Sequence, residues 1–123
     1  MWGGKKIKIR KLIALVLLGI SFSSTSHAYG IFYFTGKDLL KFCESDKSGE
    51  RSFCSGYLIG LADMYDVIAY VEATHKAFCL SQDVTGSQLR KVFIDYANDH
   101  PEEQNNPAAA NASMAYSQAF PCE

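Results

Sequence analysis

The chain has 123 residues, with 12 basic residues, 13 acidic residues and four cysteines, and its formal net charge at pH 7 is −1. Five of the basic residues and none of the acidic ones lie within residues 1–28, so residues 29–123 carry a net charge of −6. This balance makes nucleic acid and anionic membranes poor partners and favours a basic protein. The alternative explanation is that the charge only keeps a small protein soluble.

The first 28 residues show the three parts of a secretory signal peptide. A basic segment, residues 5–11, precedes a nine-residue apolar run, residues 12–20, and a small polar tail that ends at Ala28. Nine residues span about 14 Å as a helix, whereas the hydrocarbon core of a bilayer is about 30 Å thick. We therefore predict cleavage after Ala28, export from the cytoplasm, and a single domain over residues 29–123 without a membrane anchor.

A capping box opens the first predicted helix, because Thr35 and Asp38 stand three residues apart before a short apolar face. A polar turn, residues 44–50, leads to a much longer central helix, for which Ser48 or Ser52 is the candidate cap. Apolar residues recur along this helix every three or four positions, which predicts one buried stripe. The stripe consists of Phe53, Tyr57, Leu61, Met64, Ile68 and Val71.

Two glycines, Gly56 and Gly60, lie four residues apart on one side of the central helix. Each destabilises a helix by about 1 kcal/mol relative to alanine, so a compensating contact is expected. The close approach of another backbone would compensate. That backbone can belong to a neighbouring helix of the same subunit or to a second copy of the protein, and both alternatives stay open.

A second capping box, Thr85 with Gln88, opens a third helix whose apolar residues have the spacing of an amphipathic helix. Pro101 ends this helix, because proline disfavours the helical conformation of the residue before it. A polar loop over residues 99–106 follows. Asn106 as cap and Pro107 at the first helical position then predict a last helix over residues 108–120.

Four helices with short connections predict an all-α fold, a small up-down four-helix bundle. In this topology Cys43 and Cys54 lie at one end, whereas Cys79 and Cys122 close the second and fourth helices at the other end. Cys54 and Cys79 would stand about 37 Å apart along a continuous helix, but a disulfide requires Cα atoms within about 7 Å. The pairing of Cys43 with Cys54 and of Cys79 with Cys122 therefore fits the bundle best.

No group of residues predicts catalysis, so we expect neither an enzyme nor a cofactor. Glu72, His75 and Cys79 fall on one predicted helix face, but structural zinc usually takes four protein ligands and Cys79 is better used in a disulfide. A Cys–His hydrolase would need a free thiolate. Asp63 and Asp66 stand three residues apart, and we interpret them as solvent-facing or hydrogen-bonded rather than catalytic.

Short motifs follow one another in order over residues 36–122. They are Leu39-Leu40-x-x-Cys43, Cys54-x-Gly56-Tyr57-Leu58-x-Gly60-x-x-Asp63, Cys79-Leu80, Gln88-Leu89-x-x-Val92-x-x-x-Tyr96, His100-Pro101-Glu102 and Phe120-Pro121-Cys122. This ordered set, with its cysteine spacing, resembles the Tai family of type VI amidase immunity proteins. The chain departs from the family at Ser81, where proline often follows Cys-Leu, and the change loosens the turn.

The resemblance implies a helical, often dimeric periplasmic protein. Such a protein inserts a projecting segment into the Cys–His active-site groove of an NlpC/P60-like peptidoglycan amidase effector. We match this segment to the polar loop, whose candidate effector-binding residues are Asp99, His100, Glu102, Glu103, Gln104, Asn105 and Asn106. The candidate homodimer interface consists of Gly56, Tyr57 and Gly60. The alternative for the loop is that it is only solvated.

Two other classes of protein remain as alternatives. An acid-stress periplasmic chaperone would expose apolar surface at low pH, although two disulfides would resist that opening. A structural or sensor subunit of an envelope complex would have a stable endogenous partner. A neighbouring gene for a secreted amidase would favour immunity over both.

Overall fold

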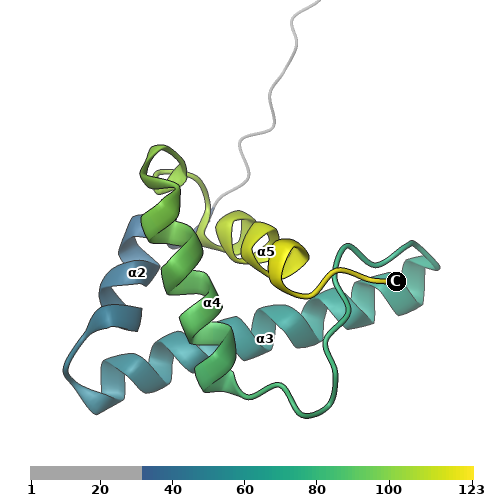
Figure 1. The fold of residues 1–123 in the computed structure, drawn as a ribbon, viewed down its shortest axis with the longest axis horizontal. Helices are drawn as coiled ribbons and strands as arrows, with labels where there is room; N and C mark the ends of the chain where they lie inside the picture. Colours follow the sequence, from purple (N-terminus) through teal and green to yellow (C-terminus); the bar gives the residue numbers. More distant parts are fainter. Residues whose placement is uncertain (1–31) are drawn as a thin grey trace, which may run out of the picture. The chain divides into compact units, whose positions relative to one another are not determined.

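The computed structural model describes residues 32–123, which form four α-helices and one short 3-10 helix (Figure 1). The elements are α2 (Gly36–Glu44), α3 (Ser48–Glu72), α4 (Gly86–Asp99), the 3-10 helix η1 (Pro101–Glu103) and α5 (Ala108–Ala119). No strand occurs among these residues. Within the same residues, no helix combines the length and hydrophobicity needed to cross a bilayer. The predicted signal peptide, residues 1–28, lies outside the described residues.

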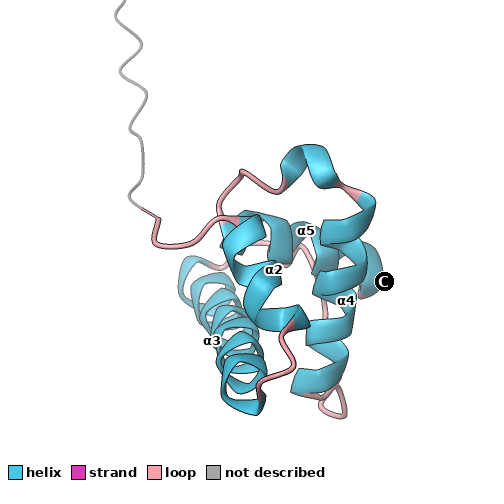
Figure 2. Cartoon of the chain, turned by 90° about the vertical axis from the view of Figure 1, so that its left-hand side faces the viewer, coloured by secondary structure: helices cyan, strands magenta, loops and turns pink. Residues whose placement is uncertain are grey.

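The predicted all-α fold with four helices and two disulfides is confirmed. Helices α2, α4 and α5 lie on the same side of α3, and α4 crosses α3 steeply (Figures 1 and 2). Cys43 bonds to Cys54 with a Cα–Cα distance of 5.1 Å, and Cys79 bonds to Cys122 with a Cα–Cα distance of 5.0 Å. The first disulfide joins α2 to α3, and the second joins the segment between α3 and α4 to the end of the chain.

Both predicted capping boxes are present. The Thr35 hydroxyl accepts from the Asp38 amide while the Asp38 carboxylate accepts from the Thr35 amide, and Thr85 and Gln88 form the same reciprocal pair at the start of α4. The two hydrogen bonds from Thr35 hold the pKa of Asp38 below its usual value. These local signals fix where α2 and α4 begin.

The buried face of α3 differs from the predicted one. The predicted stripe is largely exposed, with Met64 57% exposed and Val71 73% exposed, whereas Cys54, Leu58, Ala62 and Ala69 are buried. The prediction was wrong because α3 is apolar on two sides, and periodicity does not say which side faces the core. The disulfide to Cys43 decides the rotation, since it holds Cys54 against α2.

Three helix ends also differ from their predictions. Lys47 is the N-cap residue of α3 without a side-chain hydrogen bond, so neither Ser48 nor Ser52 caps this helix. Pro107 is the N-cap residue of α5, so Asn106 is not its cap. Helix α3 ends at Glu72, where Ala73 adopts the left-handed conformation with φ 50°.

The early end of α3 separates Glu72 from Cys79, so Cys79 does not close the helix and the predicted face with His75 does not form. The chain leaves the helix because Phe78 packs in the core, with its ring centroid 4.5 Å from that of Tyr65, and because Cys79 bonds to Cys122. Phe78 is 1% exposed. The segment between α3 and α4 is therefore anchored at its middle although it has no helical structure.

Candidate functional site

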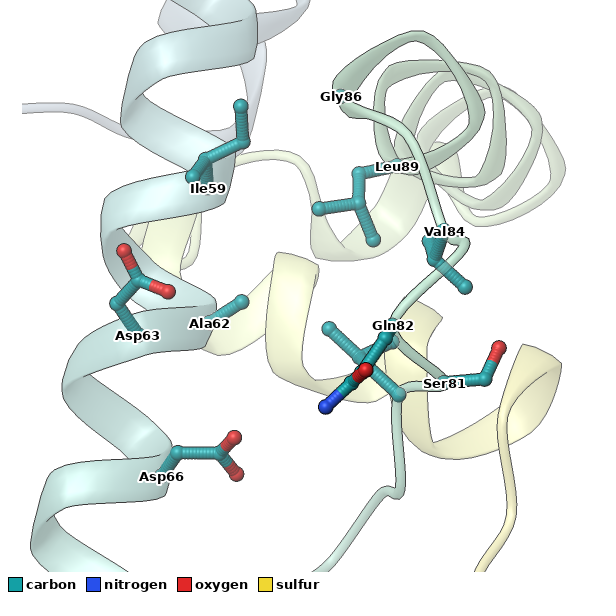
Figure 3. A pocket seen from close by; sticks show the side chains of 10 residues that line it. Ile59, Ala62, Asp63, Asp66, Ser81, Gln82, Val84, Gly86 and Leu89 are labelled. Carbon is teal, nitrogen blue, oxygen red and sulfur yellow. The ribbon is translucent and has the colours of Figure 1, made fainter.

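The two aspartates of α3 that could have formed a catalytic pair lie at the rim of a groove (Figure 3). Asp63 and Asp66 are both exposed, and the Asp66 carboxylate forms an ion pair with Lys76 at 2.9 Å. Paired catalytic carboxylates usually need a shielded environment that moves their pKa values apart. The exposed arrangement agrees with the interpretation of these residues as solvent-facing.

The polar loop over residues 99–106 projects beyond α4 and α5, on the side of the bundle away from α3 (Figures 1 and 2). Its backbone caps α2, because the amide of Gly36 donates to the carbonyl of Asn106 at 2.9 Å and the amide of Lys37 donates to that of Gln104 at 2.8 Å. The first amides of a helix have no partner inside the helix. The loop supplies these partners and is thereby fixed against α2.

Two amide side chains hold the loop from inside. Asn111 of α5 is 1% exposed, and its Nδ2 donates to the carbonyl of Glu103 at 3.1 Å. Gln104 turns back to α4, where its Nε2 donates to the carbonyl of Ala97 at 2.8 Å. Gly36 lies so close to Asn111 that a Cβ atom at this position would collide with the Asn111 amide. The absence of a side chain at Gly36 is what lets α2, α5 and the loop meet.

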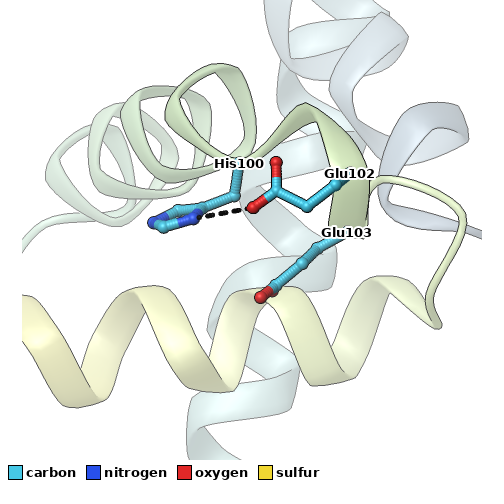
Figure 4. A group of neighbouring side chains, drawn as sticks. All are labelled: His100, Glu102 and Glu103. Atoms are coloured by element: carbon cyan, nitrogen blue, oxygen red, sulfur yellow. Dashed lines mark hydrogen bonds and ion pairs between the residues drawn. The ribbon is translucent and has the colours of Figure 1, made fainter.

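The base of the loop is tied to α4 by a buried tyrosine, which bonds to Glu103, one of the three side chains drawn in Figure 4. The Tyr96 hydroxyl donates to Glu103 Oε2 at 2.6 Å, and the His100 ring lies over Tyr96 with ring centroids 4.4 Å apart. Burial, and then the hydrogen bond to Glu103, raise the pKa of Tyr96 to about 12. The phenol therefore keeps its proton and remains a donor at neutral pH.

His100, Glu102 and Glu103 form the only group of three or more candidate metal ligands among residues 32–123, with ligand atoms within 4.8 Å of one another. His100 Nδ1 lies 3.4 Å from Glu102 Oε1, while Glu103 already accepts the hydrogen bond from Tyr96. A structural zinc site usually has four protein ligands. The group falls short of that donor set, and its hydrogen bonds account for its arrangement.

The structure divides the seven candidate effector-binding residues into two sets. Asp99, Glu102, Asn105 and Asn106 are exposed and can contact a partner, whereas His100, Glu103 and Gln104 are partly buried and hold the loop. Sequence reasoning missed Tyr96, Asn111 and Gly36 as supports of this loop. The sequence contains one signal for these supports, namely Asn111, an isolated polar residue within an alanine-rich helix.

A second surface runs along the outer side of α3. We call it the outer stripe, and it consists of Phe53, Gly56, Gly60, Met64, Val67 and Val71, all exposed. A Cβ atom added at Gly56 or Gly60 would have no neighbour within 4 Å among the described residues, so packing of these glycines within the subunit is excluded there. Tyr57 lies beside the stripe, half-buried against Phe34 with ring centroids 6.0 Å apart. Burial raises its pKa.

The outer stripe is uncharged throughout and about 27 Å long, since its ends are 18 residues apart on a helix. Exposed large apolar patches on a small protein are typical of interaction surfaces. The molecule thus presents a polar, acidic loop on one side and an apolar helix face on the other.

A comparison with known families finds a match. A family described as Rap1a immunity proteins matches residues 35–122, nearly all of the chain that the structure describes. No curated protein and no solved structure matches the chain. The matched residues include both disulfides, the 99–106 loop and the outer stripe.

Proposed function

The chain belongs to the Rap1a immunity protein family, a family of type VI secretion immunity proteins, and on this basis we propose that it neutralises a peptidoglycan amidase effector in the periplasm. The family match over residues 35–122 is the observation that carries the proposal. The family implies binding to a cognate effector and points to an inhibitor rather than an enzyme. The target class, an NlpC/P60-like amidase with a Cys–His active site, comes from the Tai resemblance.

In the proposed mechanism the 99–106 loop enters and blocks the effector's active-site groove. Asp99 and Glu102 are exposed carboxylates that would meet basic residues at the groove rim and accelerate encounter. Asn105 and Asn106 are exposed and would supply hydrogen bonds deeper in the groove. The hydrogen bonds from the loop to α2 and α5 support this role, because a loop that is already ordered loses little entropy on binding.

We propose a homodimer in which the outer stripe of one α3 packs on the outer stripe of a second copy. Gly56 and Gly60 destabilise α3 and lack a neighbour within the described part of the subunit, so a second backbone is the remaining compensating contact. Tyr57 lies at the edge of this surface. Since the 99–106 loop lies on the side away from α3, this dimer leaves both loops free (Figure 1).

The proposal is tested with the protein purified after its disulfides have formed. Candidate partners are the secreted amidases encoded near its gene, and the readouts are complex formation and peptidoglycan cleavage with and without the protein. We expect a stoichiometric complex and loss of cleavage. If no complex forms and the protein instead suppresses client aggregation at low pH, the chaperone alternative replaces the immunity proposal.

The role of the loop is tested by the double variant Asp99→Asn/Glu102→Gln. It removes two exposed charges, which contribute about 0.2–1 kcal/mol each in a solvent-exposed ion pair, so we expect a loss of inhibition that grows at low salt. Asp46→Asn/Glu72→Gln is the matched control, since it changes the net charge equally at exposed positions outside the loop. Equal effects of both double variants would contradict the loop's assigned role.

A further inference from the structure

A groove separates α3 from the segment that leads into α4, at the opposite end of α4 from the 99–106 loop (Figures 1 and 3). Its floor is apolar and includes Ala62, Val84 and Leu89. Its cavity has a volume of about 290 Å³. Small-molecule and cofactor sites usually measure about 300–1,000 Å³, so this groove lies at the lower limit of that range and is large enough for one long side chain.

One wall of the groove carries two carboxylates. Asp63 and Asp66 stand three residues apart on α3, which places them on neighbouring turns of the same helix face. The Gln82 side chain points toward α3 from the opposite wall (Figure 3). The groove therefore combines an apolar floor with a rim of two carboxylates and one amide side chain.

The rim already binds a cation. Lys76 Nζ lies 2.9 Å from Asp66 Oδ1, and the two side chains are 44% and 57% exposed. Such an exposed ion pair is weak and can exchange with another cation. Asp63 forms no ion pair with any residue in the described part of the chain. The internal ammonium thus shows the chemistry that the rim accepts and leaves one carboxylate available.

Other occupants fit less well. Two carboxylates repel an anion. A metal ion would need further ligands, and no third His, Cys, Asp or Glu among residues 32–123 joins Asp63 and Asp66. A long cationic side chain fits both parts of the groove, because its aliphatic stem can cover the apolar floor while its charged head reaches the carboxylates.

We propose that this groove receives an arginine side chain of the effector, as a second contact in addition to the 99–106 loop; this inference rests on the proposed immunity function. A planar guanidinium has five N–H donors, enough to donate to both Asp63 and Asp66. Helix α4 has 14 residues and is about 21 Å long. A standard interface covers about 800 Å² per partner, so one effector can contact both ends of α4.

The first experiment uses a probe that does not depend on the effector. Nα-acetyl-arginine amide is titrated into the ¹⁵N-labelled protein, and Nα-acetyl-citrulline amide, which has the same shape without the charge, is the control. We expect amide shifts at Ala62, Asp63 and Gln82 with the arginine probe alone. Asp63→Asn/Asp66→Asn should weaken binding about five-fold, as the loss of two exposed ion pairs predicts. Lys76→Gln should strengthen binding, since it frees Asp66.

Asp46→Asn/Asp95→Asn is the matched control, because it removes two exposed carboxylates outside the groove. Shifts that appear equally with citrulline, or an affinity for the arginine probe that is unchanged in Asp63→Asn/Asp66→Asn, would overturn the assignment of the groove as an arginine site.

The second experiment measures the affinity of Asp63→Asn/Asp66→Asn for the amidase that forms a complex with the unaltered protein. A loss of about five-fold that shrinks in high salt supports the proposal. An unchanged affinity overturns the effector contact while the immunity function stands. If no amidase binds the unaltered protein, the proposed function fails, and so does the proposal that an arginine of the effector occupies the groove. The probe titration still decides whether the groove binds a guanidinium group.

Discussion

Gly36 is the position at which the support of the 99–106 loop can be tested most directly. In Gly36→Ala the new Cβ would collide with the Asn111 amide and lie 3.2 Å from the carbonyl oxygen of Gln104. Asn111 has little freedom to move, because it is 1% exposed and donates to the carbonyl of Glu103. Overpacking of this kind destabilises by about 1–3 kcal/mol, whereas Gly→Ala at an unobstructed position stabilises by about 0.4–1 kcal/mol. The expected net loss is about 1–2 kcal/mol.

Gly49→Ala is the matched control, since Gly49 also lies in the first turn of a helix and a Cβ there would have no neighbour within 4 Å. Urea unfolding followed by far-UV circular dichroism, with the disulfides intact, should show opposite signs for the two variants. For a domain of this size, 1 kcal/mol corresponds to about 4–8 °C in melting temperature. In an Asn111→Ala background the penalty of Gly36→Ala should largely disappear. Equal stability of Gly36→Ala and Gly49→Ala would refute the proposed support of the loop.

Other predictions concern the dimer, the second disulfide and the buried tyrosine. Gly60→Ala should stabilise α3 by about 1 kcal/mol within one subunit yet weaken the dimer. By analytical ultracentrifugation Gly60→Leu should be monomeric, whereas the control Ser52→Leu, at an exposed position outside the outer stripe, should remain dimeric. A dimeric Gly60→Leu would exclude the interface. Cys79→Ser/Cys122→Ser removes a cross-link between two exposed residues that are 43 positions apart in the sequence. Urea unfolding should therefore show a loss of about 4 kcal/mol in the free energy of unfolding, and a loss below about 1 kcal/mol would contradict the stabilising role of this disulfide. The raised pKa of Tyr96 stabilises the fold fully below pH 10 and less as pH rises through about 12, so Tyr96→Phe should reduce the slope of stability against pH in that window.

The helix starts that sequence reasoning predicted correctly depend on local chemistry. Thr35 with Asp38 and Thr85 with Gln88 are each three residues apart, and each pair satisfies backbone amides next to it. The disulfide pairing was also predicted correctly, but from the topology of an up-down bundle, and the structure keeps this pairing although the central helix ends before Cys79. The capping argument is local, whereas the pairing argument depends on how the helices are arranged.

The buried face of α3 was not predictable from periodicity. Its outer stripe combines two glycines with large apolar side chains such as Phe53 and Met64, whereas its inner face combines Leu58 with small residues such as Cys54 and Ala62. Small residues let α2 and α4 approach α3 closely, and the disulfide at Cys54 sets the rotation of the helix. The position of Cys54 would have indicated the inner face once the disulfide was assigned.

The candidate loop was located from its composition, but its inward and outward residues were not. Gln104 and Asn105 are adjacent amide residues with similar chemistry, yet Gln104 bonds to Ala97 of α4 while Asn105 is exposed. The loop backbone is oriented by contacts between segments distant in sequence, namely the hydrogen bonds from the amides of Gly36 and Lys37 in α2 to the carbonyls of the loop. A single sequence contains no local signal for such contacts.

The disulfides connect the proposed function to the proposed compartment. Loop lengths predict that Cys43–Cys54 and Cys79–Cys122 stabilise the fold by about 3 and 4 kcal/mol, a large share of the 5–15 kcal/mol typical of a small domain. The first bond also holds α2, whose amides fix the 99–106 loop. A version without residues 1–28, kept in the reducing cytoplasm, should therefore be poorly folded and fail to bind the effector, whereas the same sequence oxidised after purification should bind. Equal binding by the reduced and oxidised forms would show that the loop is held without these bonds.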